Sequence, residues 1–192
     1  MPLFGRGRRQ GPRPAARAPA RPARPPREAI YEQIVDDFSD EPSQATPREI
    51  ARFLIVLKPQ VARAIEIRVS WIKELGLLFA EVQNGNPTQV TARAGRLGRE
   101  HVGAFREVRA AVDRLAPPDG CQDIHRSVLL WTDSLVKACD ALVEVGSSGQ
   151  LAGMQLVQRN VTEARHQARR FNSEYSRLLT ELRVAVRSAR RG

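Results

Sequence analysis

Residues 154–189 read MQLVQRNVTEARHQARRFNSEYSRLLTELRVAVRSA, and apolar side chains recur along this stretch at every third or fourth position. The two spacings alternate without interruption, which is typical of a helix that packs one face against its neighbours. The pattern predicts a helix over residues 148–190. Its seam comprises Met154, Val157, Val161, Ala164, Ala168, Phe171, Tyr175, Leu178, Leu182, Ala185 and Ala189.

Three further helices are predicted before this one. Residues 87–115 and 120–145 carry seams of the same kind, and residues 47–84 carry a broader apolar face. Because the segments between them are short, consecutive helices should run in opposite directions. The predicted fold class is all-α: an antiparallel up-down-up-down four-helix bundle over residues 46–192, with coiled-coil-like seams. The two middle seams are Val90, Ala94, Leu97, His101, Ala104, Val108, Ala111 and Leu115, then Ile124, Val128, Trp131, Leu135, Ala138, Leu142 and Val145.

Local signals predict where these helices begin and end. Thr46-Pro47-Arg48-Glu49 has the form of a capping box with proline at the first helical position, and Asn86-Pro87-Thr88-Gln89 repeats it. Gly85 and Gly146 stand where left-handed C-caps are expected. Pro59 should kink or split the first helix near Lys58.

The amino-terminal segment 1–27 is strongly basic. It holds eight arginines and no acid, so it supplies +8 of the chain's formal +10. It also holds seven prolines and three glycines and has few apolar side chains that a core could bury, which predicts a disordered arm. Its arginines are the candidate contacts for an anionic partner: Arg6, Arg8, Arg9, Arg13, Arg17, Arg21, Arg24 and Arg27. A coding bias is an alternative source of the basicity, because arginine outnumbers lysine 28 to 3 in this bacterial-type composition.

Residues 28–45 form an acidic linker. Six acidic residues stand between 28 and 41 without a basic one, and Ile30, Ile34 and Phe38 recur at a spacing of four. This pattern predicts a short amphipathic docking helix. Docking on the chain's own bundle is favoured over a linear motif for another protein's groove. The acidic stretch is also placed to neutralise the arm until a stronger polyanion competes.

The far end of the last helix forms a second basic tip. Its final turns should project beyond the bundle, because residues 148–190 are longer than the two middle helices. Arg187, Arg190 and Arg191 lie there and join the candidate anion contacts.

A polar layer is predicted halfway along the bundle. If the turns centre near residues 85, 117 and 147, five polar residues lie at one level: Arg68, His101, Asp133, Ser134 and Asn160. The favoured interpretation is a layer that fixes the register of the helices, and a small-ligand or anion pocket is the alternative.

No set of residues indicates catalysis, a cofactor or a metal. Glu163 and His166 have the Glu-x-x-His spacing of di-iron bundles, but no second copy exists. Gly95, Gly98 and Gly103 follow no predicted strand, so they indicate close helix approach or local weakening rather than a dinucleotide loop. No apolar run is long enough to span a membrane, and a cytoplasmic location is expected.

These features favour a non-enzymatic interaction or scaffolding protein. Its basic arm would contact nucleic acid without sequence specificity. Three alternatives stay open. The arm could meet an anionic membrane surface, where Leu3 and Phe4 would insert. The bundle could form a homo-oligomer without a nucleic-acid role. The polar layer could hold a small ligand.

Overall fold

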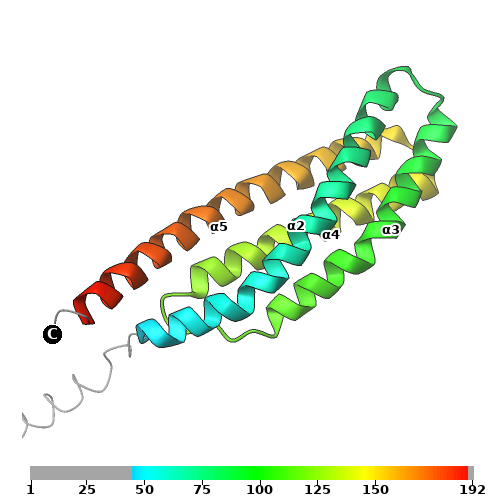
Figure 1. Ribbon diagram of the computed structural model, residues 1–192. Coiled ribbons are helices and arrows are strands. Elements are labelled where there is room, and N and C mark those ends of the chain that lie inside the picture. The colour runs from blue at the N-terminus through cyan, green and yellow to red at the C-terminus, as the bar shows by residue number, and fades with distance from the viewer. Residues whose placement is uncertain (1–44, 190–192) are drawn as a thin grey trace, which may run out of the picture. The chain divides into compact units, whose positions relative to one another are not determined.

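Four long α-helices make up the part of the chain that the structure, a computed structural model, describes, namely residues 45–189 (Figure 1). They are α2 (Pro47–Asn84), α3 (Pro87–Asp113), α4 (Gln122–Ser148) and α5 (Met154–Ala189), and a 3₁₀ turn, η1 (Leu151–Gly153), precedes α5. The described residues contain no strand, and their helix contacts fit a bundle. The all-α prediction is therefore confirmed.

The predicted helix starts are present. The Thr46 backbone N–H donates to Glu49 Oε2 at 2.8 Å, and the Glu49 N–H donates to Thr46 Oγ1 at 3.3 Å, which completes the capping box of α2. The pKa of Glu49 is lowered by the hydrogen bond from the Thr46 backbone N–H and by a second one, at 2.8 Å, that the Thr46 hydroxyl donates to Glu49 Oε2. At α3 the Asn86 side chain accepts from the Thr88 N–H at 2.9 Å. Both caps satisfy amides that a helix start leaves unpaired.

Two predicted helix caps differ from the structure. Gly85 has φ −88°, so it is no left-handed cap. Gly146 lies inside α4, which ends at Ser148, and Gly149 supplies the left-handed cap with φ +68°. The fourth helix consequently begins at Met154 rather than near residue 148. Pro59 lies within a continuous α2 and does not split it.

The helix pair α3–α4 packs through glycines. A Cβ added to Gly95 would lie 2.9 Å from the Cα of Gly146, and one added to Gly98 would lie 2.5 Å from the Cys139 carbonyl oxygen. Such distances leave no room for a side chain, so the close approach requires glycine there. Gly103, by contrast, has open space around it. The sequence prediction of close approach therefore holds for two of its three glycines.

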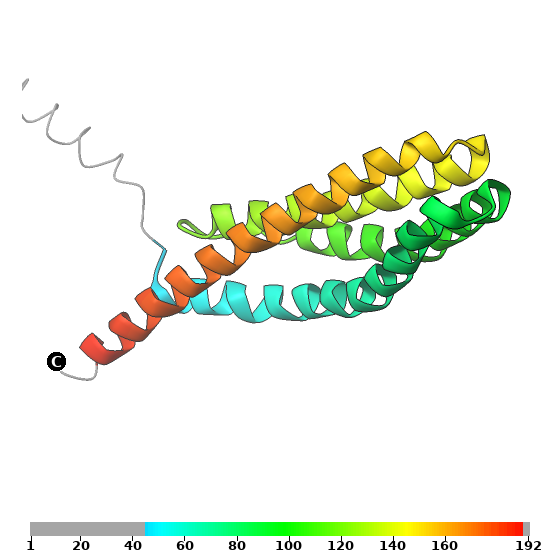
Figure 2. The same ribbon diagram turned by 90° about the horizontal axis from the view of Figure 1, so that it is seen from above.

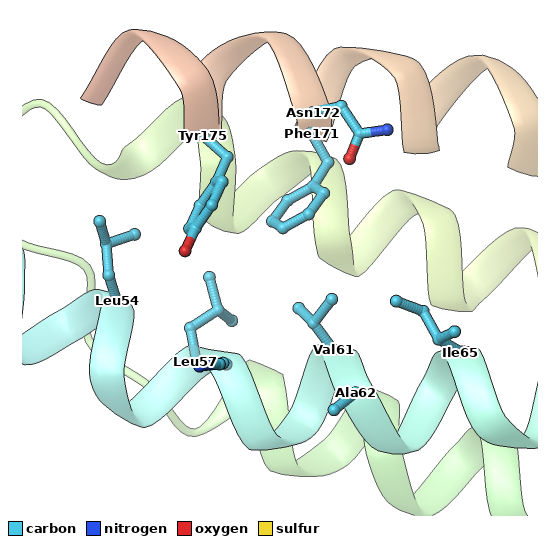
Figure 3. Close-up of a pocket in the computed structure, with 9 residues that line it drawn as sticks. Leu54, Leu57, Val61, Ala62, Ile65, Phe171, Asn172 and Tyr175 are labelled. Carbon is cyan, nitrogen blue, oxygen red and sulfur yellow. The ribbon is translucent and has the colours of Figure 1, made fainter. Parts of the chain in front are cut away.

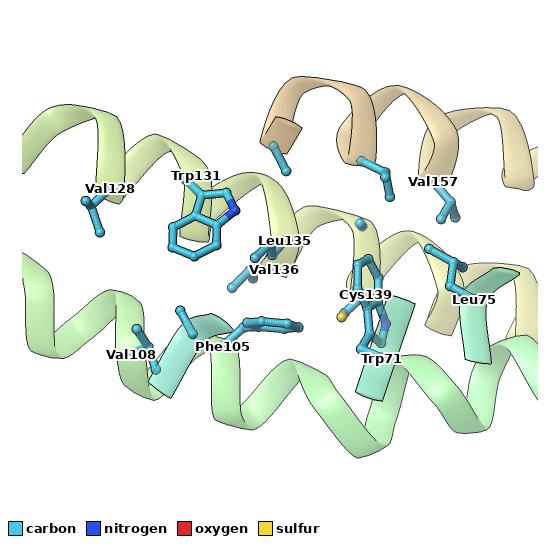
Figure 4. Packing of buried hydrophobic residues seen from close by; sticks show 14 of the residues in the cluster. Trp71, Leu75, Phe105, Val108, Val128, Trp131, Leu135, Val136, Cys139 and Val157 are labelled. Carbon is cyan, nitrogen blue, oxygen red and sulfur yellow. The ribbon is translucent and has the colours of Figure 1, made fainter. Parts of the chain in front are cut away.

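Helix α4 lies at the centre of the packing. Its contacts with α3 and α5 are the most extensive in the bundle, and it runs beside α5 in both views (Figures 1 and 2). Trp131 and Leu135 of α4 join Trp71 of α2, Phe105 of α3 and Val157 of α5 in one buried cluster (Figure 4). The last turns of α5 project beyond the other helix ends.

None of the helices described between residues 45 and 189 is at once long and apolar enough to cross a membrane.

Candidate functional site

A groove separates α2 from α5. These two helices contact each other far less than the α3–α4 and α4–α5 pairs do. A hollow of about 290 Å³ lies between them. Phe171 and Tyr175 point from α5 toward α2, and Leu57 and Val61 point back toward α5 (Figure 3). We call this hollow, with Leu54 at its end, the apolar end of the α2–α5 groove.

The side chains of the apolar end follow from helical spacing. Leu54, Leu57 and Val61 are three or four residues apart and form one face of α2, and Phe171 and Tyr175 are four apart on α5. The rings of Phe171 and Tyr175 stack, with centroids 5.7 Å apart. Both rings are only half-buried, so the hollow has room for further apolar side chains.

The groove continues into a second hollow that is basic. Arg68 of α2 and Arg165 and Arg169 of α5 line it, together with Val61, Ile65 and Phe171. No acidic side chain lines either hollow. Within residues 45–189, no carboxylate forms an ion pair with any of these three arginines. We call this hollow the basic end of the groove.

A buried donor also lies at the basic end. Trp131 lines the second hollow, and its indole Nε1–H is buried without an acceptor among the described residues. A buried N–H without a partner costs free energy, which an incoming carboxylate or carbonyl oxygen would recover. The groove as a whole is therefore suited to a ligand that is apolar on one face and anionic at its edges.

The five residues predicted to form a polar layer contact other groups rather than one another. His101 Nδ1 lies 3.2 Å from the Leu97 carbonyl oxygen of its own helix, and Ser134 donates to the Leu130 carbonyl at 2.8 Å. Arg68 lines the groove, and Asn160 is half-buried on α5. No hydrogen bond or ion pair that the structure shows for residues 45–189 joins two of the five.

The pairing of α3 with α4 explains where Asp133 lies. Asp133 Oδ1 is 3.2 Å from Arg109 Nε, and Arg106 Nη2 is 2.7 Å from Asp140. Asp133 thus faces Arg109, two helical turns beyond His101. The loop between α3 and α4, residues 114–121, is centred near residue 117 as expected, so its length does not account for this pairing.

Phe105 is, together with Val112, a core residue of α3 that the predicted seam omitted. It is fully buried, whereas His101 is only half-buried, and its ring meets Trp71 edge-to-face with centroids 5.8 Å apart. The sequence did contain a signal: Leu97, Phe105, Val108 and Val112 also keep helical spacing and include the larger apolar side chains.

Metal and thiol chemistry find no support in the described part of the chain. Residues 45–189 hold no group of three or more His, Cys, Asp or Glu that could bind a metal ion. Glu163 and His166 are both largely exposed, 3.9 Å apart. Burial raises the pKa of the Cys139 thiol to about 12 and also raises that of Cys121. Neither cysteine is therefore a ready nucleophile.

The predicted anion contacts lie mostly outside the described residues. This applies to the eight arginines of residues 1–27 and to Arg190 and Arg191. The predicted docking residues Ile30, Ile34 and Phe38 also lie outside the described residues. Arg187 is described and is exposed near the end of α5.

Comparison of the chain with protein-family models, with curated proteins and with solved structures yields no match in any of the three.

Proposed function

We propose that this chain is a non-enzymatic interaction protein whose basic arm, residues 1–27, binds nucleic acid without sequence specificity. The observation that carries the proposal is the concentration of charge. Eight arginines stand in 27 positions without one acid, while residues 28–192 balance 23 basic against 21 acidic residues. The arm is proposed to be disordered and to follow the path of the phosphate backbone.

The chemistry of arginine supports a phosphate polymer as the partner. Each guanidinium that neutralises a phosphate releases condensed counterions, so several together give affinity that depends steeply on salt. Phe4 is the one aromatic residue in the arm, so stacking on bases contributes little. Contacts to phosphates carry no sequence information, which is why the proposed binding is non-specific.

The bundle is proposed to be the rigid body that carries the arm, with an antiparallel up-down-up-down course. Ion pairs support this order of helices: Glu81 near the end of α2 pairs with Arg93 early in α3, and Arg63 pairs with Glu107 later in α3. As the residue number rises along α3 from 93 to 107, the number of its partner falls along α2 from 81 to 63, as expected for antiparallel neighbours.

The test is the salt dependence of binding by the full chain. Fluorescence anisotropy with labelled duplex DNA should give a slope of log K against log[salt] no steeper than about −7, since each neutralised phosphate contributes about −0.9. Substitution of Arg6, Arg8, Arg9 and Arg13 by glutamine should reduce the magnitude of that slope by about 3 to 4.

A matched variant replaces four exposed arginines of the bundle, Arg114, Arg126, Arg159 and Arg183, by glutamine. It removes the same charge and should retain most of the slope. Equal losses in the two variants would contradict a role for the arm. Binding to phosphatidylserine vesicles with no affinity for duplex DNA would replace nucleic acid by a membrane surface as the partner.

A further inference from the structure

The apolar end of the α2–α5 groove has no occupant among the described residues. Leu57 and Val61 form its floor, while Ile65 at its edge leaves 48% of its surface exposed. Burial of apolar side chains in such a hollow stabilises a complex in proportion to the apolar area removed from water. A segment with apolar residues at helical spacing is the natural ligand for a groove between two helices.

We propose that residues 28–41 of the same chain bind in the α2–α5 groove as an amphipathic helix. Ile30, Ile34 and Phe38 would enter the apolar end beside Phe171 and Tyr175. This assignment names the surface on which the acidic segment docks, and it is independent of the proposed binding of nucleic acid.

The length of the chain outside the described residues fits this groove. Fourteen residues in helical form measure about 21 Å, which is also the distance along α2 from Leu54 to Arg68. Residues 42–45 connect the segment to the cap of α2 at Thr46. With residue 41 level with Leu54, the linker must cover about 12 Å along α2 and about 8 to 10 Å between the helices, roughly 15 Å in all, and the five steps from residue 41 to Thr46 span up to about 17 Å when extended. The connection therefore permits a helical hairpin without strain.

Charge complementarity favours this occupant over others. Residues 28–41 carry six acidic residues and no basic one, whereas residues 45–189 carry 21 Lys and Arg against 15 Asp and Glu. The groove concentrates that excess, because Lys58, Arg68, Arg165 and Arg169 line it and no acid does. Carboxylates at the edges of the segment would meet these cations, and the apolar stripe would meet the floor.

A hairpin of this length also predicts which side chains meet. With residue 41 level with Leu54 and the segment running back along α2, Asp37 is level with Lys58 and borders the apolar stripe, whereas Glu32 and Asp36 lie on the opposite face of the segment. Glu28 is brought toward Arg169 at the basic end. No acidic residue lies within four positions of Lys58 along its own helix, so a carboxylate there must come from another segment.

Zero-length crosslinking of the full chain tests the proposal, because the chain has only three lysines: Lys58, Lys73 and Lys137. A carbodiimide joins a carboxylate to an amine only where the two touch, and peptide mass mapping then identifies the pair. We expect Lys58 to be joined to Asp37. Lys73 is the matched control, since it is exposed on the same helix about 22 Å further along.

Lys137 reports that the reaction works, because its Nζ lies 2.8 Å from Asp133. The Ile34→Asp variant should lose the Lys58 crosslink, whereas Gln33→Asp adds the same charge beside the apolar stripe and should retain it. Neither substitution touches the core of the bundle.

Three outcomes would overturn the proposal. The first is a Lys137–Asp133 crosslink without one at Lys58. The second is equal crosslinking of residues 28–41 to Lys58 and Lys73. The third is a Lys58 crosslink that joins ¹⁵N-labelled to unlabelled chains in a mixture, which would make a second copy the donor. Since no nucleic acid is present, failure here leaves the proposed function standing.

Discussion

At the scale of single residues, the contact between Trp71 and Phe105 joins α2 to α3. Both side chains are fully buried, and their rings meet edge-to-face at an angle of 81°. Large aromatic side chains contribute more buried area than other residues. This pair therefore supplies much of the buried area at its level of the bundle. His101, one helical turn away on α3, contacts the carbonyl of Leu97 and leaves part of its surface in solvent.

The difference between these two positions gives a stability prediction. Phe105→Ala should lower the free energy of unfolding by about 3 to 5 kcal/mol, because it removes a buried ring and leaves a cavity. His101→Ala should cost less than about 1 kcal/mol, since it removes no fully buried group and alanine favours a helix. Urea denaturation of both variants measures the contrast. A larger loss at His101 than at Phe105 would contradict the packing described for α3.

At the scale of elements, the α3–α4 pair depends on the absence of side chains. Gly95 and Gly98 allow the backbone of α3 to lie directly against Gly146 and Cys139 of α4. Glycine ordinarily weakens a helix by about 1 kcal/mol relative to alanine. The chain retains it here because the close approach brings buried residues of both helices, such as Val108 and Leu135, into one core.

Alanine substitution at two glycines of the same helix separates these effects. Gly98→Ala should destabilise the protein by about 1 to 3 kcal/mol, because its Cβ would press on the backbone of α4. Gly103→Ala meets nothing within 4 Å and should stabilise the protein by about 0.5 to 1 kcal/mol through helix propensity alone. Thermal melts followed by circular dichroism report both shifts. A stabilising effect at Gly98 would show that the helices lie further apart.

At the scale of the whole molecule, stability should be uneven across the bundle. Helix α4 packs against both α3 and α5, whereas α2 contacts α3 moderately and α5 little. Pro59 further removes one backbone hydrogen bond from the interior of α2. Segments with fewer buried contacts open at lower free-energy cost than the core does.

Hydrogen exchange measures this unevenness. In the full chain, amides of α2 between Leu54 and Ile65 should exchange faster than those of α4 between Val128 and Leu142, which lie at the centre of the packing. Peptide-resolved mass spectrometry over a time course is the measurement. Uniform protection of both segments would indicate that α2 is held as firmly as α4 and would contradict the uneven stability.

The sequence by itself determined that residues 45–189 form four long helices and where α2 and α3 begin. These outcomes depend on side chains within about four positions of one another, such as Thr46 with Glu49 and Asn86 with Thr88. They can therefore be predicted from short stretches of sequence. Only the tertiary structure decided which glycine ends α4. Gly146 has the composition of a cap, yet contact with Gly95, some 50 positions away, keeps it inside the helix.

The register between helices was likewise a tertiary outcome. Sequence spacing admitted both His101 and Phe105 to the seam of α3, and the pairing of Asp133 with Arg109 follows from all contacts of α3 with α4 taken together. The α2–α5 groove has the same origin. The apolar and basic residues of α2 and α5 are visible in the sequence, but the loose spacing of the two helices is set by how tightly each packs on its other neighbour. Local patterns fix each helix, whereas the gaps between helices depend on the packing of the whole bundle.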